Sequence, residues 1–290
     1  MDRFKSANKA SILGILVNIF LLIIKITIGF ISNSQAMIAD AFNSFGDVLS
    51  SLLTFIGNKI SSKEADDDHH LGHGKAEYIY AFLISIIMFI TSVMVIKNAI
   101  GTYLNHNKIN FSFYLILVCI ITIISKFCLY LYTKSIGKKH HNILVEANSK
   151  DHRNDCFITA MTLTSAVLGI YVLDIIIGII ISLWMMITAV KIFKESYDIL
   201  MDKAMDDSTK DKVYEIIKKH DEVLKVQHFN TTPVGYRYQI SFTIFVDGNL
   251  STFESHDIAD SLEKEIRKEI PEIYLSIIHV NPMKVNKKDK

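Results

Sequence analysis

Hydrophobic residues dominate the first two thirds of the chain and form runs long enough to cross a lipid bilayer. A helical crossing needs about 20 predominantly apolar residues. Six runs have this length, at residues 10–31, 36–58, 78–100, 112–134, 147–171 and 173–193. The second and fifth are the least apolar because each contains several Asp and Asn residues. The pattern therefore predicts six membrane-spanning helices, two of which carry polar side chains at bilayer depth.

The hydrophobic pattern changes after about residue 200, where shorter segments replace the long apolar runs. It predicts a helix, two strands, a helix and a strand, at residues 209–220, 223–230, 236–246, 252–269 and 273–281. We therefore expect an α-helical membrane protein with two domains. Residues 1–199 form the six-helix transmembrane domain, and residues 200–290 form a small α+β domain of ferredoxin-like type on the cytoplasmic side.

The distribution of charge predicts how the helices are oriented in the membrane. Lys and Arg number 31 against 30 Asp and Glu, so the net charge gives no reason to expect a nucleic-acid partner. The basic residues gather before the first run, in the 59–75 and 133–141 loops, and after the sixth run. Because basic loops stay in the cytoplasm, we expect a multi-pass protein of the cell membrane with both termini inside.

Two acidic stripes lie within the predicted helices. Asp40, Asn43 and Asp47 in the second run have the spacing n, n+3, n+7, and Asn148, Asp151 and Asp155 in the fifth have the same spacing. This spacing puts each triple on one helical face. A carboxylate at bilayer depth is costly unless it is paired or binds a cation. We expect no Lys or Arg beside these Asp residues in the helix interiors, so the stripes predict a cation site.

The same segments carry a family resemblance. The strings IADAFNSFGD (38–47) and DDDHHLGHGKAE (66–77), together with residues 151–155, resemble the cation diffusion facilitator family over nearly the whole chain. The resemblance implies a homodimeric metal/proton antiporter. It also implies a transport site made of Asn43, Asp47, Asp151 and Asp155, with Asp40 and Asn148 as auxiliary residues.

The ligand types narrow the choice of metal. Zinc-transporting members of that family place His in one or two of the four positions, whereas this chain has one Asn and three Asp. Oxygen ligands suit hard cations such as Mn2+, and imidazole suits Zn2+. The set also resembles that of manganese-exporting members. We expect Mn2+ as the cargo, with Fe2+ and Zn2+ as alternatives. Binding needs deprotonated carboxylates, so at least one Asp is expected to take up a proton when the metal leaves. No cofactor is expected.

Three further groups have possible roles. Asp66, His69 and His73 match positions that bind a second metal in some family members, although a solvated acidic loop explains them equally well. His228, His256 and His279 match positions of regulatory metals between protomers. This chain departs from that pattern with Phe242 and Asn281, and scattered surface histidines are the simpler interpretation. Lys75 and Asp202 both belong at the inner membrane surface, where they can form a charge pair.

Two functions of other classes compete with transport. An intramembrane metalloenzyme needs an open coordination position and a general base, but the sequence contains no HExxH, GxSxG or comparable motif. A metal sensor would use the helices only as an anchor, and an anchor has no use for intramembrane Asp residues. We therefore predict a transporter rather than an enzyme.

Overall fold

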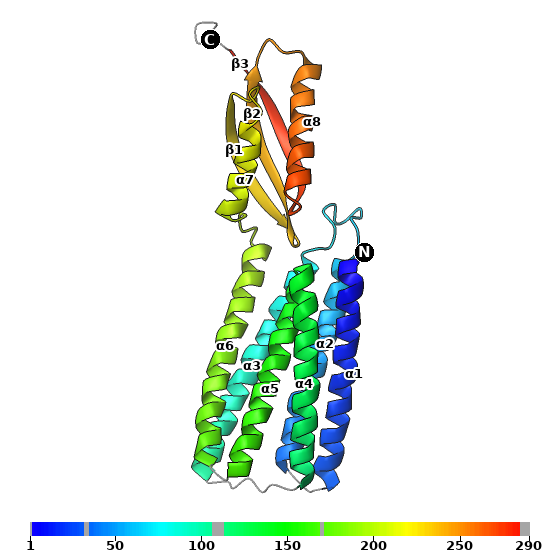
Figure 1. Cartoon of the computed structure of the whole chain (residues 1–290), viewed down its shortest axis with the longest axis vertical. Coiled ribbons are helices and arrows are strands. Elements are labelled where there is room, and N and C mark those ends of the chain that lie inside the picture. Colours follow the sequence, from blue (N-terminus) through cyan, green and yellow to red (C-terminus); the bar gives the residue numbers. More distant parts are fainter. Residues whose placement is uncertain (1, 32–34, 106–112, 169–170, 285–290) are drawn as a thin grey trace. The chain divides into compact units, whose positions relative to one another are not determined.

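Six long helices form the first part of the chain in the computed structural model (Figure 1). They are α1 (Asp2–Ile31), α2 (Gln35–Ser61), α3 (Ala76–Asn105), α4 (Phe113–His140), α5 (Ile143–Leu168) and α6 (Tyr171–Leu200). The structure describes residues 2–31, 35–105, 113–168 and 171–284. Within the helices it leaves out some side chains, among them those of residues 35–43. The six helices and the domain that follows them confirm the predicted fold class.

Three of these helices are long and apolar enough, among the described residues, to cross a membrane. They cover Arg3–Ile28 in α1, Ala76–Lys97 in α3 and Ile116–His140 in α4. Large apolar side chains such as Leu16, Met94 and Ile124 are exposed on their outer faces. A continuous surface of this kind is unfavourable in water and is the surface that a lipid-facing helix presents.

Polar contacts hold α2 against its neighbours. Asn18 of α1 donates through Nδ2 to the Asp47 carbonyl at 3.1 Å and to Ser51 Oγ at 2.9 Å. Asn142, directly before α5, donates to Asn58 Oδ1 at 2.7 Å. Interhelical hydrogen bonds of this kind replace the hydrophobic effect as a source of specificity inside a bilayer. They fix the position of α2, which carries Asp47.

The chain divides into two compact units. Met1–Glu64 and Ala76–Tyr197 form the first, and Ala65–Lys75 and Asp198–Lys290 form the second. The loop between α2 and α3 thus groups with the C-terminal part of the chain. Gly74 in this loop lies against Gly235, which has a φ of +65°, and a Cβ atom on Gly235 would lie 3.0 Å from the Cα atom of Gly74. The loop can make this contact only because both residues lack a side chain.

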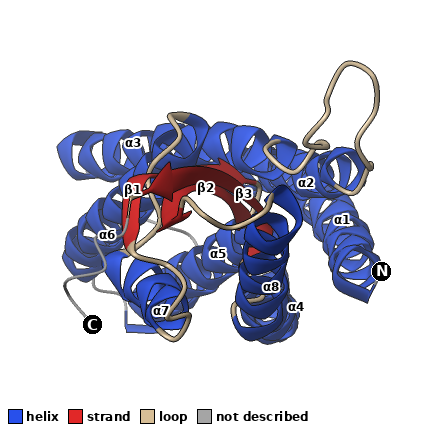
Figure 2. Ribbon diagram, turned by 90° about the horizontal axis from the view of Figure 1, so that it is seen from above, coloured by secondary structure: helices blue, strands red, loops and turns tan. Residues whose placement is uncertain are grey.

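The second unit contains a three-stranded sheet with two helices on one face (Figure 2). Its elements are α7 (Asp207–Lys218), β1 (Lys225–Val234), β2 (Arg237–Asp247), α8 (Thr252–Glu269) and β3 (Ile273–Met283). The strand order is β1-β2-β3, antiparallel between the first two and parallel between β2 and β3. Alternate β2 residues, from Ile240 to Val246, form the core with residues of both helices, including Val213 and Leu262.

Gly57 marks the tightest packing of α2 and leads to a test of the helical arrangement. A Cβ atom at Gly57 would lie 2.7 Å from Leu144 Cδ1 and 2.8 Å from Tyr80 Cβ, whereas one at Gly46 meets no described atom within 4 Å. We expect Gly57→Ala to lower the free energy of unfolding by about 1–3 kcal/mol because the core is overpacked. Gly46→Ala on the same helix is the control, and we expect it to be neutral or stabilising by up to about 1 kcal/mol. Thermal unfolding in detergent checks the pair. Equal stability of both variants would contradict this packing.

Candidate metal centre

Three buried carboxylates meet between α2 and α5. Asp47, Asp151 and Asp155 each offer an oxygen atom, and these atoms all lie within 4.8 Å of one another. The three residues are 5–7% exposed. Oxygen ligands that share one cation at about 2.0–2.6 Å lie no more than about 5 Å apart. The cluster therefore has the dimensions of a single metal site.

The helical spacing explains how the two stripes supply these ligands. Asp151 and Asp155 are four residues apart in α5 and so project from one face. Asp47 reaches the same place from α2. Asn148, one turn before Asp151, is also buried, and its Oδ1 atom has no hydrogen-bond partner among the described atoms. Asn43 and Asp40 belong to α2, but their side chains lie outside the described residues.

The expectation that no basic residue lies beside the Asp residues is wrong. Lys126 of α4 donates through Nζ to Asp47 Oδ2 and to Asp155 Oδ2, at 2.7 Å in both cases. Its side chain is 1% exposed. Lys126 comes from a helix that carries neither stripe, but a Lys in the middle of the apolar 112–134 run is itself a signal of a buried ion pair.

Two other basic side chains near the site make contacts with other residues. Lys25 of α1 is buried and donates to Ser44 Oγ at 2.9 Å. Arg153, although it lies between Asp151 and Asp155 in the sequence, stacks on Trp184 of α6, with its Cζ atom 4.3 Å from the ring centroid. Proximity in the sequence therefore does not determine which cation pairs with these carboxylates.

A second group of possible metal ligands lies in the loop between α2 and α3. Asp66 Oδ1 is 3.2 Å from His69 Nδ1, and Asp66 Oδ2 is 3.5 Å from His73 Nε2. The pKa of Asp66 is lowered, chiefly by the hydrogen bond from the His69 backbone N–H. Asp66 therefore stays anionic to a lower pH than an ordinary Asp. One carboxylate and two imidazoles form a ligand set that suits a borderline divalent ion.

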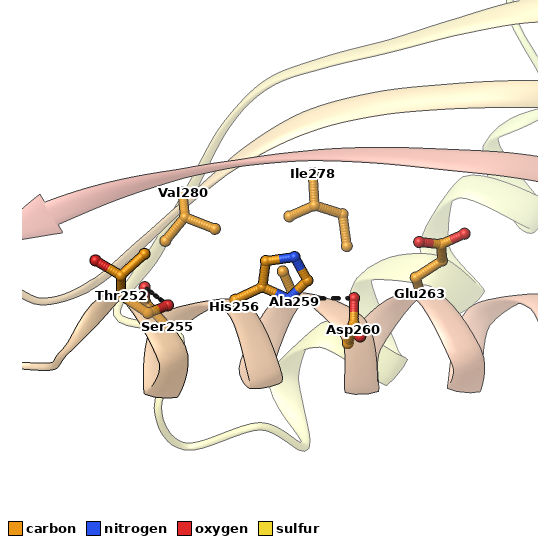
Figure 3. A pocket seen from close by; sticks show the side chains of 8 residues that line it. All are labelled: Thr252, Ser255, His256, Ala259, Asp260, Glu263, Ile278 and Val280. Atoms are coloured by element: carbon orange, nitrogen blue, oxygen red, sulfur yellow. Dashed lines mark hydrogen bonds and ion pairs between the residues drawn. The ribbon is translucent and has the colours of Figure 1, made fainter.

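The three C-terminal histidines lie on different elements. His228 lies in β1 at an irregularity in the strand pairing, with a φ of 53°, and His279 in β3 pairs with Thr243. His256 of α8 is 3.5 Å from Asp260 and borders a groove of about 390 Å³ between α8 and β3 (Figure 3). Within the described part of a single chain, these histidines belong to no group of three metal ligands. A site shared between protomers stays a prediction.

Lys75 and Asp202 are in contact within one chain. Lys75 Nζ donates to Asp202 Oδ1 at 2.6 Å, and both side chains are more than one third exposed. An exposed pair of this kind contributes about 0–1 kcal/mol, so its main effect is on the local position of the loop and not on stability.

The family of the chain follows from comparison with known proteins. Residues 11–201 match the cation efflux transmembrane domain, and residues 205–283 match the cytoplasmic domain of cation efflux proteins. The chain belongs to the cation efflux family. It is therefore a multi-pass membrane transporter that exports divalent metal cations and not an enzyme, and its C-terminal domain is the dimerisation domain of that family.

Individual relatives match nearly the whole chain. The manganese efflux system protein MneP of Bacillus subtilis is 26% identical over 291 residues, which cover 97% of this chain and 98% of MneP. MneS of the same organism is 27% identical over 285 residues, covering 97% and 98%. The cation-efflux pump FieF of Shewanella oneidensis is 28% identical over 284 residues, covering 97% and 95%. The likeness thus extends over both domains.

The group of Asp66, His69 and His73 leads to a test in which a neighbouring His provides the control. We expect His73→Ala to lower the number of divalent metal ions bound per chain by one, because His73 is one of the three possible ligands that converge in the loop. His70→Ala should leave the bound metal unchanged, since His70 lies in the same loop but outside that group. Metal content after equilibrium dialysis measures the stoichiometry. A solvated loop without metal would give the same value for both variants and the unchanged chain.

Proposed function

We propose that this protein is a homodimeric Mn2+/H+ antiporter that moves Mn2+ out of the cytoplasm. In this proposal Asp47, Asp151 and Asp155 are the anionic ligands of the transported ion, and Asn43 completes the set. The main support is the cluster of three buried carboxylate oxygens within 4.8 Å of one another. A protein has little reason to bury three like charges together unless a cation joins them.

The donor atoms favour Mn2+ over Zn2+. All described ligands of the cluster are carboxylates, and the proposed fourth ligand is an amide. Hard oxygen donors reduce the advantage in binding affinity that Zn2+ has over Mn2+ at nitrogen- and sulfur-containing sites. Cellular availability can then decide which metal is transported. MneP and MneS, both manganese efflux system proteins, are among the relatives that match over the full length. Fe2+ and Zn2+ are the alternatives within the same family.

Proton exchange follows from the chemistry of the same ligands. A metal binds carboxylates in their deprotonated form, so metal binding and proton binding compete for the same oxygen atoms. When Mn2+ leaves toward the outside, carboxylates that Lys126 does not neutralise can accept protons. The ion pairs of Lys126 involve Asp47 and Asp155. We therefore assign the coupled proton mainly to Asp151, for which the described residues provide no ion-pair partner within 4.0 Å.

Transport and coupling can be measured together in proteoliposomes. We expect inward Mn2+ flux to drive outward proton flux, recorded with one dye for the metal and one for pH. Asp155→Asn should reduce Mn2+ flux by at least about a hundredfold, equivalent to about 2.7 kcal/mol, because it removes an anionic ligand that water cannot replace. The control is Asp221→Asn, in an exposed turn after α7. Normal flux in Asp155→Asn would exclude this site, and Mn2+ flux without proton movement would favour uniport.

Selectivity has its own test at Asn43. Asn43→His exchanges one neutral ligand for another, so it changes donor type without changing charge. We expect the Zn2+ to Mn2+ transport ratio to rise about tenfold, which corresponds to about 1.4 kcal/mol of discrimination. Asn249→His, in an exposed turn of the second unit, controls for an added imidazole elsewhere. An unchanged ratio in vesicles assayed side by side would show that cavity shape or the access route selects the metal.

A further inference from the structure

Lys126 is positioned between two of the proposed metal ligands. It comes from α4, a helix that contributes none of the three clustered carboxylates, and it is buried at 1% exposure. Its Nζ atom lies 2.7 Å from Asp47 Oδ2 and 2.7 Å from Asp155 Oδ2. The ammonium group thus bridges α2 and α5 where a cation shared by Asp47 and Asp155 would also lie.

An ammonium and a divalent metal cannot share this position. Both would lie against the carboxylates of Asp47 and Asp155, and the two positive charges would repel each other strongly at a separation of a few ångströms in a site with little water. Binding of the metal by Asp47 and Asp155 therefore requires the Lys126 ammonium to move. A lysine can do so without any movement of its helix, because its charge lies at the end of a flexible four-carbon chain.

We propose that Lys126 is a tethered cation that occupies the transport site when no metal is bound and competes with the incoming metal. This inference rests on the proposed function, in which Asp47 and Asp155 hold the transported ion. The ammonium supplies the charge that the two buried carboxylates need during the metal-free half of the cycle. It also weakens metal binding, because each incoming ion must first displace two charge-assisted hydrogen bonds. Lys126 is an affinity-determining residue that leaves Asp47 and Asp155 when a metal binds and returns to them when the metal leaves.

A permanent structural role makes different predictions. If Lys126 only fastens α2, α4 and α5 together, a metal must bind without displacing it, for example at Asp151 alone. Removal of the ammonium would then loosen the helices, lower the melting temperature, and leave metal affinity unchanged or weaker. The two roles thus predict different results: the dissociation constant falls if Lys126 competes with the metal, and stays the same or rises if its role is structural.

The test compares Mn2+ affinity among variants by calorimetry in detergent. We expect Lys126→Met and Lys126→Gln to bind Mn2+ at least tenfold more tightly than the unchanged protein, since the internal competitor is gone. The Gln variant keeps an amide donor to the carboxylates, so it provides a second neutral variant if the Met variant does not fold. Lys126→Arg keeps the charge and should bind no more tightly. Lys134→Met, two turns along the same helix, where Lys134 donates to Tyr130, is the control and should be unchanged. Unchanged or weaker binding in both neutral variants overturns the proposal.

A second measurement uses the unchanged protein and does not depend on how any variant folds. Lysine acetylation by acetic anhydride, mapped by mass spectrometry, is compared with and without Mn2+. Displacement from Asp47 and Asp155 should increase the labelling of Lys126 at least threefold, while Lys134 labelling stays constant. Equal labelling of Lys126 in both states refutes displacement. Failure of the proposed function looks different: Asp155→Asn would then leave Mn2+ binding unchanged, both with Lys126 present and in the Lys126 variants.

Discussion

The cost of burying charge is the constraint on which the rest of the transmembrane unit depends. Three carboxylates lie within 4.8 Å of one another at less than a tenth exposure, and such a group is stable only with cations close by. Lys126 provides one such cation at 2.7 Å from two of the three. The hydrogen bonds of Asn18 and Asn142 then fix α2 so that Asp47 stays within reach. The unit is thus organised around a charge requirement, which Lys126 meets in this structure and which a metal ion would meet in the proposed transport cycle.

The location of the acidic cluster was predictable from local rules. Spacing alone places Asp151 and Asp155 on one face of α5, and the cost of intramembrane charge shows that these residues need a cation. The elements of the second unit were predictable for a similar reason, since alternation along β2 reflects a sheet with one buried face. Both signals come from residues close in sequence. Such signals can be recognised in one sequence without knowledge of which helices or strands pack together.

The identity of the cation beside the cluster could not be obtained in this way. Lys126 lies 79 residues from Asp47 and 29 from Asp155, so only the packing of α4 against α2 and α5 brings the three together. Arg153 shows the reverse case, because it adjoins the acidic residues in sequence but stacks on Trp184. The grouping of the 65–75 loop with the second unit is likewise a tertiary result. Sequence periodicity identifies which residues share a face and says nothing about which faces meet.

The contact of Gly74 with Gly235 has a consequence for how this sequence can change over time. A Cβ atom on either residue would meet backbone atoms of the other at 3.0–3.1 Å, so a substitution at either position is penalised whatever residue stands at the partner position. Gly235 carries a further restriction from its positive φ, which side-chain-bearing residues rarely adopt. The pair therefore acts as one inherited unit that joins the history of the 65–75 loop to that of the β1–β2 turn. Among descendants of this chain, loss of either glycine should accompany a change in the backbone path of one of the two segments.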